Sequence, residues 1–213
     1  MMGKRRAQTG YCADKFPACG LATMAPRQSA LMDDTETLHD GRWLKLKRRN
    51  GWEFAERANP QGAVIIVAIT DQSELILVEQ YREPLRALTI EMPAGLIGDL
   101  PGLEHEDAIA TAHRELIEET GYAAARIDYI VGGPVSAGMS TEVAHFVRAV
   151  GLKKVGAGGG DASENITVHR LPLAEAGSWL LQKGREGYPL DPKLWAGLYF
   201  AERDASGKPW SAK

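Results

Sequence analysis

Alternating and continuous apolar stretches in the first third of the chain predict two kinds of β-strand. Residues 43–47 and 52–56 alternate between apolar and polar side chains, and Asn50-Gly51 lies between them. Asn-Gly is a preferred sequence for tight two-residue turns, so this region is predicted to form a β-hairpin. Residues 62–69 are apolar without interruption, which is typical of a strand buried on both faces.

A helix is predicted within residues 104–122. The stretch is rich in strong helix formers, it lacks proline, and Gly121 suits the left-handed conformation that ends many helices. Residues 156–160 contain four glycines, and this composition predicts a flexible loop. Further strands are predicted at residues 74–81, 88–91, 126–131, 142–150 and 166–171, and further helices at residues 173–183 and 194–203. Strands dominate the first half and helices are few, so we expect an α+β fold.

The 213 residues suit one domain with a sizeable core, together with short extensions. Residues 1–40 mix glycine, proline, serine and charged residues without sustained periodicity. We therefore expect a flexible leader at residues 1–40, a domain that includes the hairpin at residues 41–204, and a tail at residues 205–213.

The net charge and the hydropathy of the chain limit the kinds of molecule that the protein is expected to bind. The net charge is −3, which gives no electrostatic footprint for nucleic acid, so an anionic substrate would need local help from arginine, lysine or metal. No apolar run in the sequence approaches the length of a membrane span. The basic residues near the start precede no hydrophobic segment of a secretory signal. We expect a cytoplasmic protein with a small-molecule substrate and no nucleic-acid or membrane partner.

Three carboxylates concentrate near the end of the predicted helix. Glu115 and Glu119 are one turn apart on one face, and Glu118 lies beside them. Mutual repulsion disfavours their ionisation, and a divalent cation such as Mg²⁺ or Mn²⁺ would remove that penalty. The alternative is a solvated acidic face. However, the helix dipole disfavours anions at this end, so selection for stability alone would avoid the placement.

The same helix carries a resemblance to a known family. Residues 114–122 read Arg-Glu-Leu-Ile-Glu-Glu-Thr-Gly-Tyr, and Glu106 stands eight residues before Arg114. This spacing is similar to the second half of the Nudix box. The segments 91–96, 52–54, 78–82 and 163–166 are similar to flanking segments of ADP-ribose pyrophosphatase-like members. The resemblance extends over roughly residues 42–203.

The resemblance implies a Nudix fold, which is a mixed β-sheet sandwiched between α-helices, here with an N-terminal β-hairpin. It implies metal-dependent hydrolysis of a nucleoside diphosphate linked to another moiety, with ADP-ribose giving AMP and ribose 5-phosphate as the leading reaction. Glu115 and Glu119 match the principal metal ligands, Glu118 a further acid, and the carbonyl of Ala94 another ligand position. Arg114 matches the arginine that orients the box carboxylates.

The remaining candidates come from flanking segments. Glu164 is the candidate for the catalytic base or a further metal ligand, and Glu142 is the alternative for that role. Arg82 is a candidate for binding a substrate phosphate, and Glu91 for binding the nucleoside or its ribose. Trp52 is a candidate for stacking on the base, although aromatic residues in a hairpin are more often packing residues.

The sequence also departs from the family pattern. Leu100 occupies the position of the first glycine of the box, and Gly95 fits that role if about five residues are inserted. Ala137 stands where ADP-ribose pyrophosphatases typically carry proline. A pyrophosphatase for another nucleotide sugar or dinucleotide therefore remains an alternative, as does a non-catalytic nucleotide sensor. By analogy with similar enzymes, the hairpin at residues 42–56 is expected to take part in a homodimer.

Overall fold

The N-terminal β-hairpin forms where the sequence predicts it. The computed structural model describes residues 34–58, 61–160, 165–204 and 206–209. Strands β2 (Leu44–Arg49) and β3 (Trp52–Arg57) pair antiparallel around a turn in which Asn50 and Gly51 have φ angles of 49° and 81°. These positive angles are those that a tight hairpin turn of this kind requires. A further strand, β1 (Glu36–Asp40), pairs with β2 inside the expected leader, so regular structure begins earlier than the sequence predicted.

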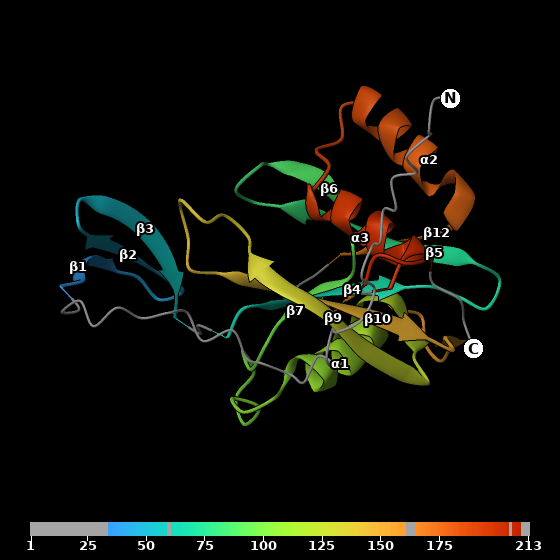
Figure 1. Cartoon of the computed structure of the whole chain (residues 1–213), viewed down its shortest axis with the longest axis horizontal. Coiled ribbons are helices and arrows are strands. Elements are labelled where there is room, and N and C mark those ends of the chain that lie inside the picture. Colours follow the sequence, from blue (N-terminus) through green and yellow to red (C-terminus); the bar gives the residue numbers. More distant parts are fainter. Residues whose placement is uncertain (1–33, 59–60, 161–164, 205, 210–213) are drawn as a thin grey trace, which may run out of the picture. The chain divides into compact units, whose positions relative to one another are not determined.

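A four-stranded mixed sheet forms the centre of the unit from Thr35 onward (Figure 1). Its strands, in spatial order, are β7 (Ala94–Leu96), β4 (Ala63–Ala68), β10 (Val143–Val150) and β9 (Arg126–Pro134). Strands β4 and β10 are parallel, and the other neighbours are antiparallel.

A second sheet is antiparallel and supplies part of the site. Strand β5 (Glu74–Arg82) lies between β12 (Thr167–Pro172) and β6 (Ala87–Glu91). Two short strands pair antiparallel. They are β8 (Tyr122–Ala123), which comes after the first helix in sequence, and β11 (Lys153–Lys154), which comes after β10. This pair was not predicted, because two-residue strands carry no periodic signal.

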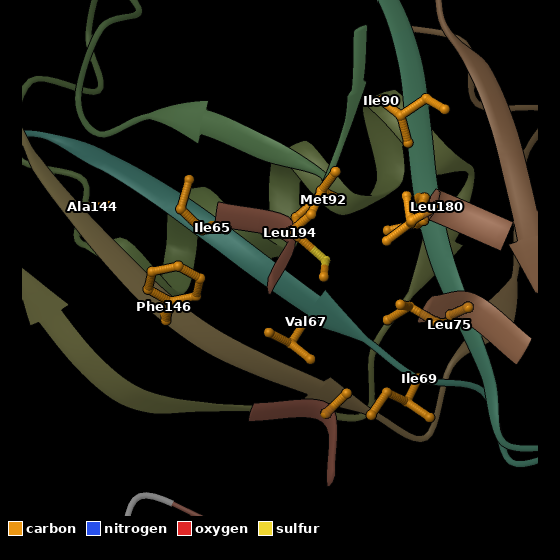
Figure 2. Packing of buried hydrophobic residues seen from close by; sticks show 13 residues of the cluster. Ile65, Val67, Ile69, Leu75, Ile90, Met92, Ala144, Phe146, Leu180 and Leu194 are labelled. Atoms are coloured by element: carbon orange, nitrogen blue, oxygen red, sulfur yellow. The ribbon is translucent and has the colours of Figure 1, made fainter. Parts of the chain in front are cut away.

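Strand β4 divides the core between two layers. Ile65, Val67 and Ile69 face a cluster that includes residues of α2 (Leu173–Arg185) and α3 (Lys193–Glu202) (Figure 2). Val64, Ile66 and Ala68 face a second cluster that includes residues of α1 (Ala108–Thr120). The prediction of a strand buried on both faces is therefore confirmed, and the mixed sheet lies between helices.

Helix α1 has defined caps at both ends. The side chain of Asp107 accepts hydrogen bonds from the backbone N–H groups of Ile109 and Ala110, both at 2.9 Å. Gly121 ends the helix in the left-handed conformation with φ of 69°. Since the first helical residue is Ala108, Glu106 lies before the helix rather than within it.

The described part of the glycine-rich segment packs on the end of α1. The N–H groups of Gly159 and Gly160 donate to the carbonyls of Glu119 and Glu118 at 2.8 and 3.0 Å. A Cβ atom on Gly158 would lie 2.4 Å from the backbone of Thr120. Residues 156–160 form a loop, as predicted, but the expected flexibility is wrong, because these glycines permit close packing that long-range hydrogen bonds hold in place.

No helix in the described ranges is long and apolar enough to cross a membrane.

Candidate active site

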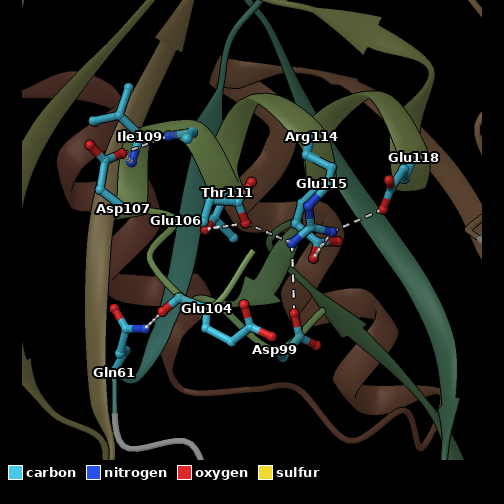
Figure 3. A network of polar contacts seen from close by, with 11 residues as sticks. Gln61, Asp99, Glu104, Glu106, Asp107, Ile109, Thr111, Arg114, Glu115 and Glu118 are labelled. Carbon is cyan, nitrogen blue, oxygen red and sulfur yellow. Dashed lines mark hydrogen bonds and ion pairs between the residues drawn. The ribbon is translucent and has the colours of Figure 1, made fainter. Parts of the chain in front are cut away.

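The guanidinium of Arg114 lies among acidic side chains on and before α1 (Figure 3). Its Nη1 atom donates to Glu115 Oε1 at 2.8 Å and to Glu118 Oε2 at 3.1 Å. Its Nη2 atom donates to Glu106 Oε2 at 3.1 Å and lies 3.7 Å from Asp99 Oδ1. Arg114 thus holds carboxylates from the helix and from the preceding loop in one cluster.

Strand β7 brings backbone groups close to two carboxylates of α1. Glu119 is buried, and its Oε2 accepts a hydrogen bond from the N–H of Ala94 at 3.0 Å. A Cβ atom on Gly95 would lie 2.1 Å from the carboxyl carbon of Glu115. Any larger residue at position 95 would displace that carboxylate, so the glycine defines where Glu115 lies.

A cavity of about 640 Å³ lies beside these groups. Glu118 is not among the described residues that line it, since its half-exposed side chain turns to Arg114. The predicted site residues that do line the cavity are Ala94, Glu115, Glu119, Arg82, Glu91 and Glu142.

The donor set fits a divalent cation. Burial raises the pKa of Glu115 to about 7, although Arg114 favours its charged form, and a nearby cation would offset this cost. The carboxylates of Glu115 and Glu119 and the carbonyl of Ala94 are hard oxygen donors of the kind Mg²⁺ and Mn²⁺ prefer. Within the described residues, no three acidic, histidine or cysteine side chains form a preassembled metal cluster.

The flanking candidates are engaged in ion pairs. Arg82 donates two hydrogen bonds to Glu91, from Nε at 2.7 Å and from Nη2 at 2.8 Å. Glu142 is bound by Nε of Arg57, which comes from β3. Because Arg57 neutralises Glu142, this carboxylate is a weaker candidate for a base than the sequence suggested.

Sequence reasoning missed four charged residues that line the cavity, namely Arg57, Asp99, Asp191 and Lys193. Each is a single charged residue at a strand end, in a loop or at a helix start, so no periodic pattern marks it. The residues before Lys193 gave one usable signal, because Asp-Pro ahead of an apolar run is a typical helix start.

Three predicted residues that the structure describes do not line the cavity, namely Arg114, Glu118 and Trp52. Trp52 is 66% exposed and lines a separate cavity of about 390 Å³ with Phe54, Arg49 and Ala137. Within one chain, Trp52 and the acidic residues of α1 therefore line different cavities. Glu164 lies outside the described residues.

The sequence and the fold are similar to those of known proteins. The NUDIX domain model matches residues 59–192. A methanol dehydrogenase activator of Bacillus methanolicus is 36% identical over 156 residues, which cover 70% of this chain and 82% of that protein. An ADP-ribose pyrophosphatase of Mycobacterium tuberculosis is 34% identical over 155 residues, which cover 70% of this chain and 73% of that protein. A solved ADP compounds hydrolase matches 69% of this chain and 80% of its own, with a TM-score of 0.55 and 26% identity.

The chain therefore belongs to the Nudix hydrolase family. The resemblance seen in the helix sequence is confirmed, and so is the expected α+β fold with a mixed sheet between helices. Its relatives include ADP-ribose pyrophosphatases, and enzymes of this family generally use divalent metals.

Proposed function

We propose that this chain hydrolyses the pyrophosphate bond of ADP-ribose to give AMP and ribose 5-phosphate. The observation that carries the proposal is a cavity of about 640 Å³ in which Glu115 and Glu119 lie together beside the backbone of β7. This volume is within the range of small-molecule sites. The names of the Mycobacterium relative and of the solved ADP compounds hydrolase support the choice of substrate.

The proposed roles divide binding from proton transfer. Glu115, Glu119 and the carbonyl of Ala94 would hold a divalent cation, with Mg²⁺ preferred and Mn²⁺ as the alternative. When bound, such a cation would neutralise diphosphate charge and lower the pKa of water. Arg114 orients Glu115 and Glu118 through its hydrogen bonds. Glu164 is proposed as the base that accepts the proton of the attacking water, and Arg82 and Glu91 as substrate-binding residues.

A substrate panel with mass-spectrometric identification of products tests the reaction. ADP-ribose should give AMP and ribose 5-phosphate only when Mg²⁺ or Mn²⁺ is present. Efficient cleavage of another nucleotide sugar or dinucleotide, with ADP-ribose left intact, would support the alternative that Ala137 suggested. Tight binding without cleavage of any compound would identify a nucleotide sensor.

The substitution Glu115→Gln tests the acidic cluster. It keeps the size of the side chain but removes the charge, so we expect kcat to fall by about two or more orders of magnitude. Stability should change little, because the charged carboxylate is disfavoured by burial. Glu175→Gln is the matched control, since Glu175 is an exposed residue on α2. Unchanged turnover in Glu115→Gln would refute the assignment.

We further propose that the chain forms a homodimer through its hairpin. Trp43 and Trp52 are 68% and 66% exposed, and Leu44 and Leu46 are also exposed. Covering such an apolar surface would favour association. Sedimentation at micromolar concentration should give a dimer, and the double substitution of Trp43→Ser and Leu46→Ser should shift it toward monomer. A wild-type chain that sediments only as a monomer would refute the proposal.

A further inference from the structure

Three ion pairs line the cavity in addition to the acidic side chains near Arg114. Arg82 pairs with Glu91 and Arg57 pairs with Glu142, as described above. The third pair joins Nζ of Lys193 to Oδ2 of Asp191 at 2.5 Å. Among the described residues that line the cavity, each lysine or arginine therefore has a carboxylate partner.

The Lys193 pair is held in place by its backbone. Asp191 Oδ1 accepts the N–H of Lys193 at 2.7 Å, so one carboxylate binds both the backbone and the side chain of the same residue. Leu190 forms a parallel bridge with Ile90 of β6, which joins this segment to the strand that carries Glu91. Lys193 also contributes to lowering the pKa of Glu91, which places the two charges near each other.

The Glu91 carboxylate is similarly occupied. Its Oε1 accepts hydrogen bonds from Arg82 Nε at 2.7 Å and from the hydroxyl of Thr89 at 2.5 Å, and its Oε2 accepts from Arg82 Nη2 at 2.8 Å. An incoming phosphate or carboxylate would have to compete with this bound carboxylate and would be repelled by it. Like charges brought together at a binding surface lower the affinity.

Hydroxyl groups face no such penalty at these pairs. A sugar hydroxyl accepts a hydrogen bond from a cation and donates one to the neighbouring carboxylate, so paired charges match vicinal hydroxyls. The other carboxylates of the lining, Asp99, Glu115 and Glu119, belong to the α1 end, where the proposed cation would meet the diphosphate. The three ion pairs of Arg57, Arg82 and Lys193, here called the charge-balanced wall, are thus available to bind the groups attached to the diphosphate.

We infer that the Arg57, Arg82 and Lys193 pairs bind an uncharged polyol part of the substrate and select against an additional phosphate on its sugars. The inference rests on the proposed function, because it assumes that the substrate is a nucleoside diphosphate linked to a second group. It gives Arg82 a sugar-binding role in place of the phosphate-binding role expected from the sequence, and it assigns Lys193 and Asp191 to substrate specificity.

The selectivity of the wild-type enzyme is the first test. We would compare kcat/KM for ADP-ribose with kcat/KM for ADP-ribose carrying one more phosphate, either at 1″ of the terminal ribose or at 2′ of the adenosine. At least one phosphorylated compound should be cleaved at least tenfold less efficiently. A reduction smaller than tenfold for both compounds would overturn the inference.

Substitution of Asp191 tests the wall itself. Asp191→Asn removes the negative charge but keeps an oxygen that accepts the N–H of Lys193, so the start of α3 is preserved. Lys193 then lacks its carboxylate partner and can bind a phosphate. The ratio of kcat/KM for the disfavoured phosphorylated compound to kcat/KM for ADP-ribose should therefore rise at least fivefold over the wild type. The added substitution Lys193→Met should abolish this gain. No gain in Asp191→Asn would overturn the role given to this pair.

Asp128→Asn is the matched control, because Asp128 forms a similar short-range pair with Arg126 on the partly exposed β9. Its substrate ratio should equal that of the wild type. A ratio that shifts as far as in Asp191→Asn would show a general charge effect and overturn the inference.

A binding measurement separates this inference from the proposed function. Calorimetry in EDTA uses the bisphosphate that corresponds to the disfavoured compound, either ribose 1,5-bisphosphate or adenosine 2′,5′-bisphosphate, and requires no hydrolysis and no metal. Asp191→Asn should bind it at least fivefold more tightly than the wild type, and Asp191→Asn with Lys193→Met should not. Failure to cleave ADP-ribose would refute the proposed function, whereas equal binding by all three proteins would refute the charge-balanced wall.

Discussion

The glutamates of the site show how neighbours set the chemistry of one residue type. Burial raises the pKa of Glu115 to about 7, because the partial compensation by Arg114 does not cancel the loss of hydration. Burial would also raise the pKa of Glu91, but two hydrogen bonds and the charge of Arg82, with help from Thr89, lower it below its ordinary value. Whether a buried glutamate is charged near neutral pH thus depends on how fully its partners compensate for the lost hydration.

Removing the partner of Glu91 should make stability strongly dependent on pH. Because the folded-state pKa of Glu91 is lowered, its contribution is present above the unfolded pKa of about 4.3 and is lost as pH falls through the folded pKa. Arg82→Met should therefore cost ~2–4 kcal/mol at pH 7, since only the Thr89 hydroxyl and the charge of Lys193 then offset the burial of the Glu91 carboxylate. The cost should shrink toward pH 4, where Glu91 of the variant takes up a proton because the charge of Arg82 no longer lowers its pKa.

Urea denaturation across that pH range measures the effect. The double substitution Arg82→Met and Glu91→Gln is the control, because it removes the unpaired charge and should recover part of the stability at pH 7. A loss in Arg82→Met that is the same at pH 4 and pH 7 would contradict the argument.

Individual site residues were predictable where a local segment of sequence carried them, most directly in the helix. Arg114, Glu115, Glu118 and Glu119 share one short pattern, so the sequence identified them together. By contrast, the contact of Arg57 with Glu142 joins positions 85 residues apart. Such a pair depends on how β3 meets the start of β10, and neither local composition nor periodicity contains that information.

At the scale of elements, local signals predicted well and long-range contacts did not. The Asn50-Gly51 turn and the apolar run of β4 are determined by nearby residues, and both were correct. The described glycines of the loop after β11 were misjudged because glycine content reports conformational freedom in isolation. Hydrogen bonds from Gly159 and Gly160 to the end of α1 supply order that composition does not reveal.

The contacts at the end of α1 also compensate for the unfavourable position of its acidic residues. The N–H groups of Gly159 and Gly160 bind the last carbonyls of the helix, and Nζ of Lys154 binds the carbonyl of Thr120 at 2.8 Å. The C-terminal end of a helix carries partial negative charge, which disfavours the carboxylates of Glu118 and Glu119. The positive charge of Lys154 and the added N–H donors offset this negative charge. The element as a whole therefore tolerates what the helix alone would not.

Gly158→Ala should reveal the strength of this docking. The residue has φ of 74°, and a Cβ atom would lie 2.4 Å from the Thr120 backbone, so the loop must shift. We expect a loss of ~2–4 kcal/mol, or a fall in Tm of about 5–15 °C. Gly133→Ala is the control, since nothing lies near its Cβ position. Equal melting temperatures for the two variants would show that the loop does not stabilise α1.

At the scale of the whole molecule, the cavity gathers residues from most of the fold. Its wall extends in sequence from Arg57 in β3 to Lys193 in α3 and includes Ala94 of β7 and Glu115 of α1. Binding at such a site should stabilise the folded chain as a unit, because the unfolded chain does not hold these groups together. The proposed cation is therefore expected to act on global stability as well as on turnover.

Addition of Mg²⁺ should raise the melting temperature of the metal-free protein. At a concentration about 100-fold above the dissociation constant, mass action contributes ~2.7 kcal/mol, which corresponds to about 5–10 °C for a chain of this size. The rise should disappear in Glu115→Gln, which lacks a charged ligand, and should persist in Glu175→Gln on the exposed side of α2. EDTA should reverse it, because only the bound ion is responsible. A shift of the same size in Glu115→Gln would place the cation elsewhere and separate metal binding from the acidic cluster of α1.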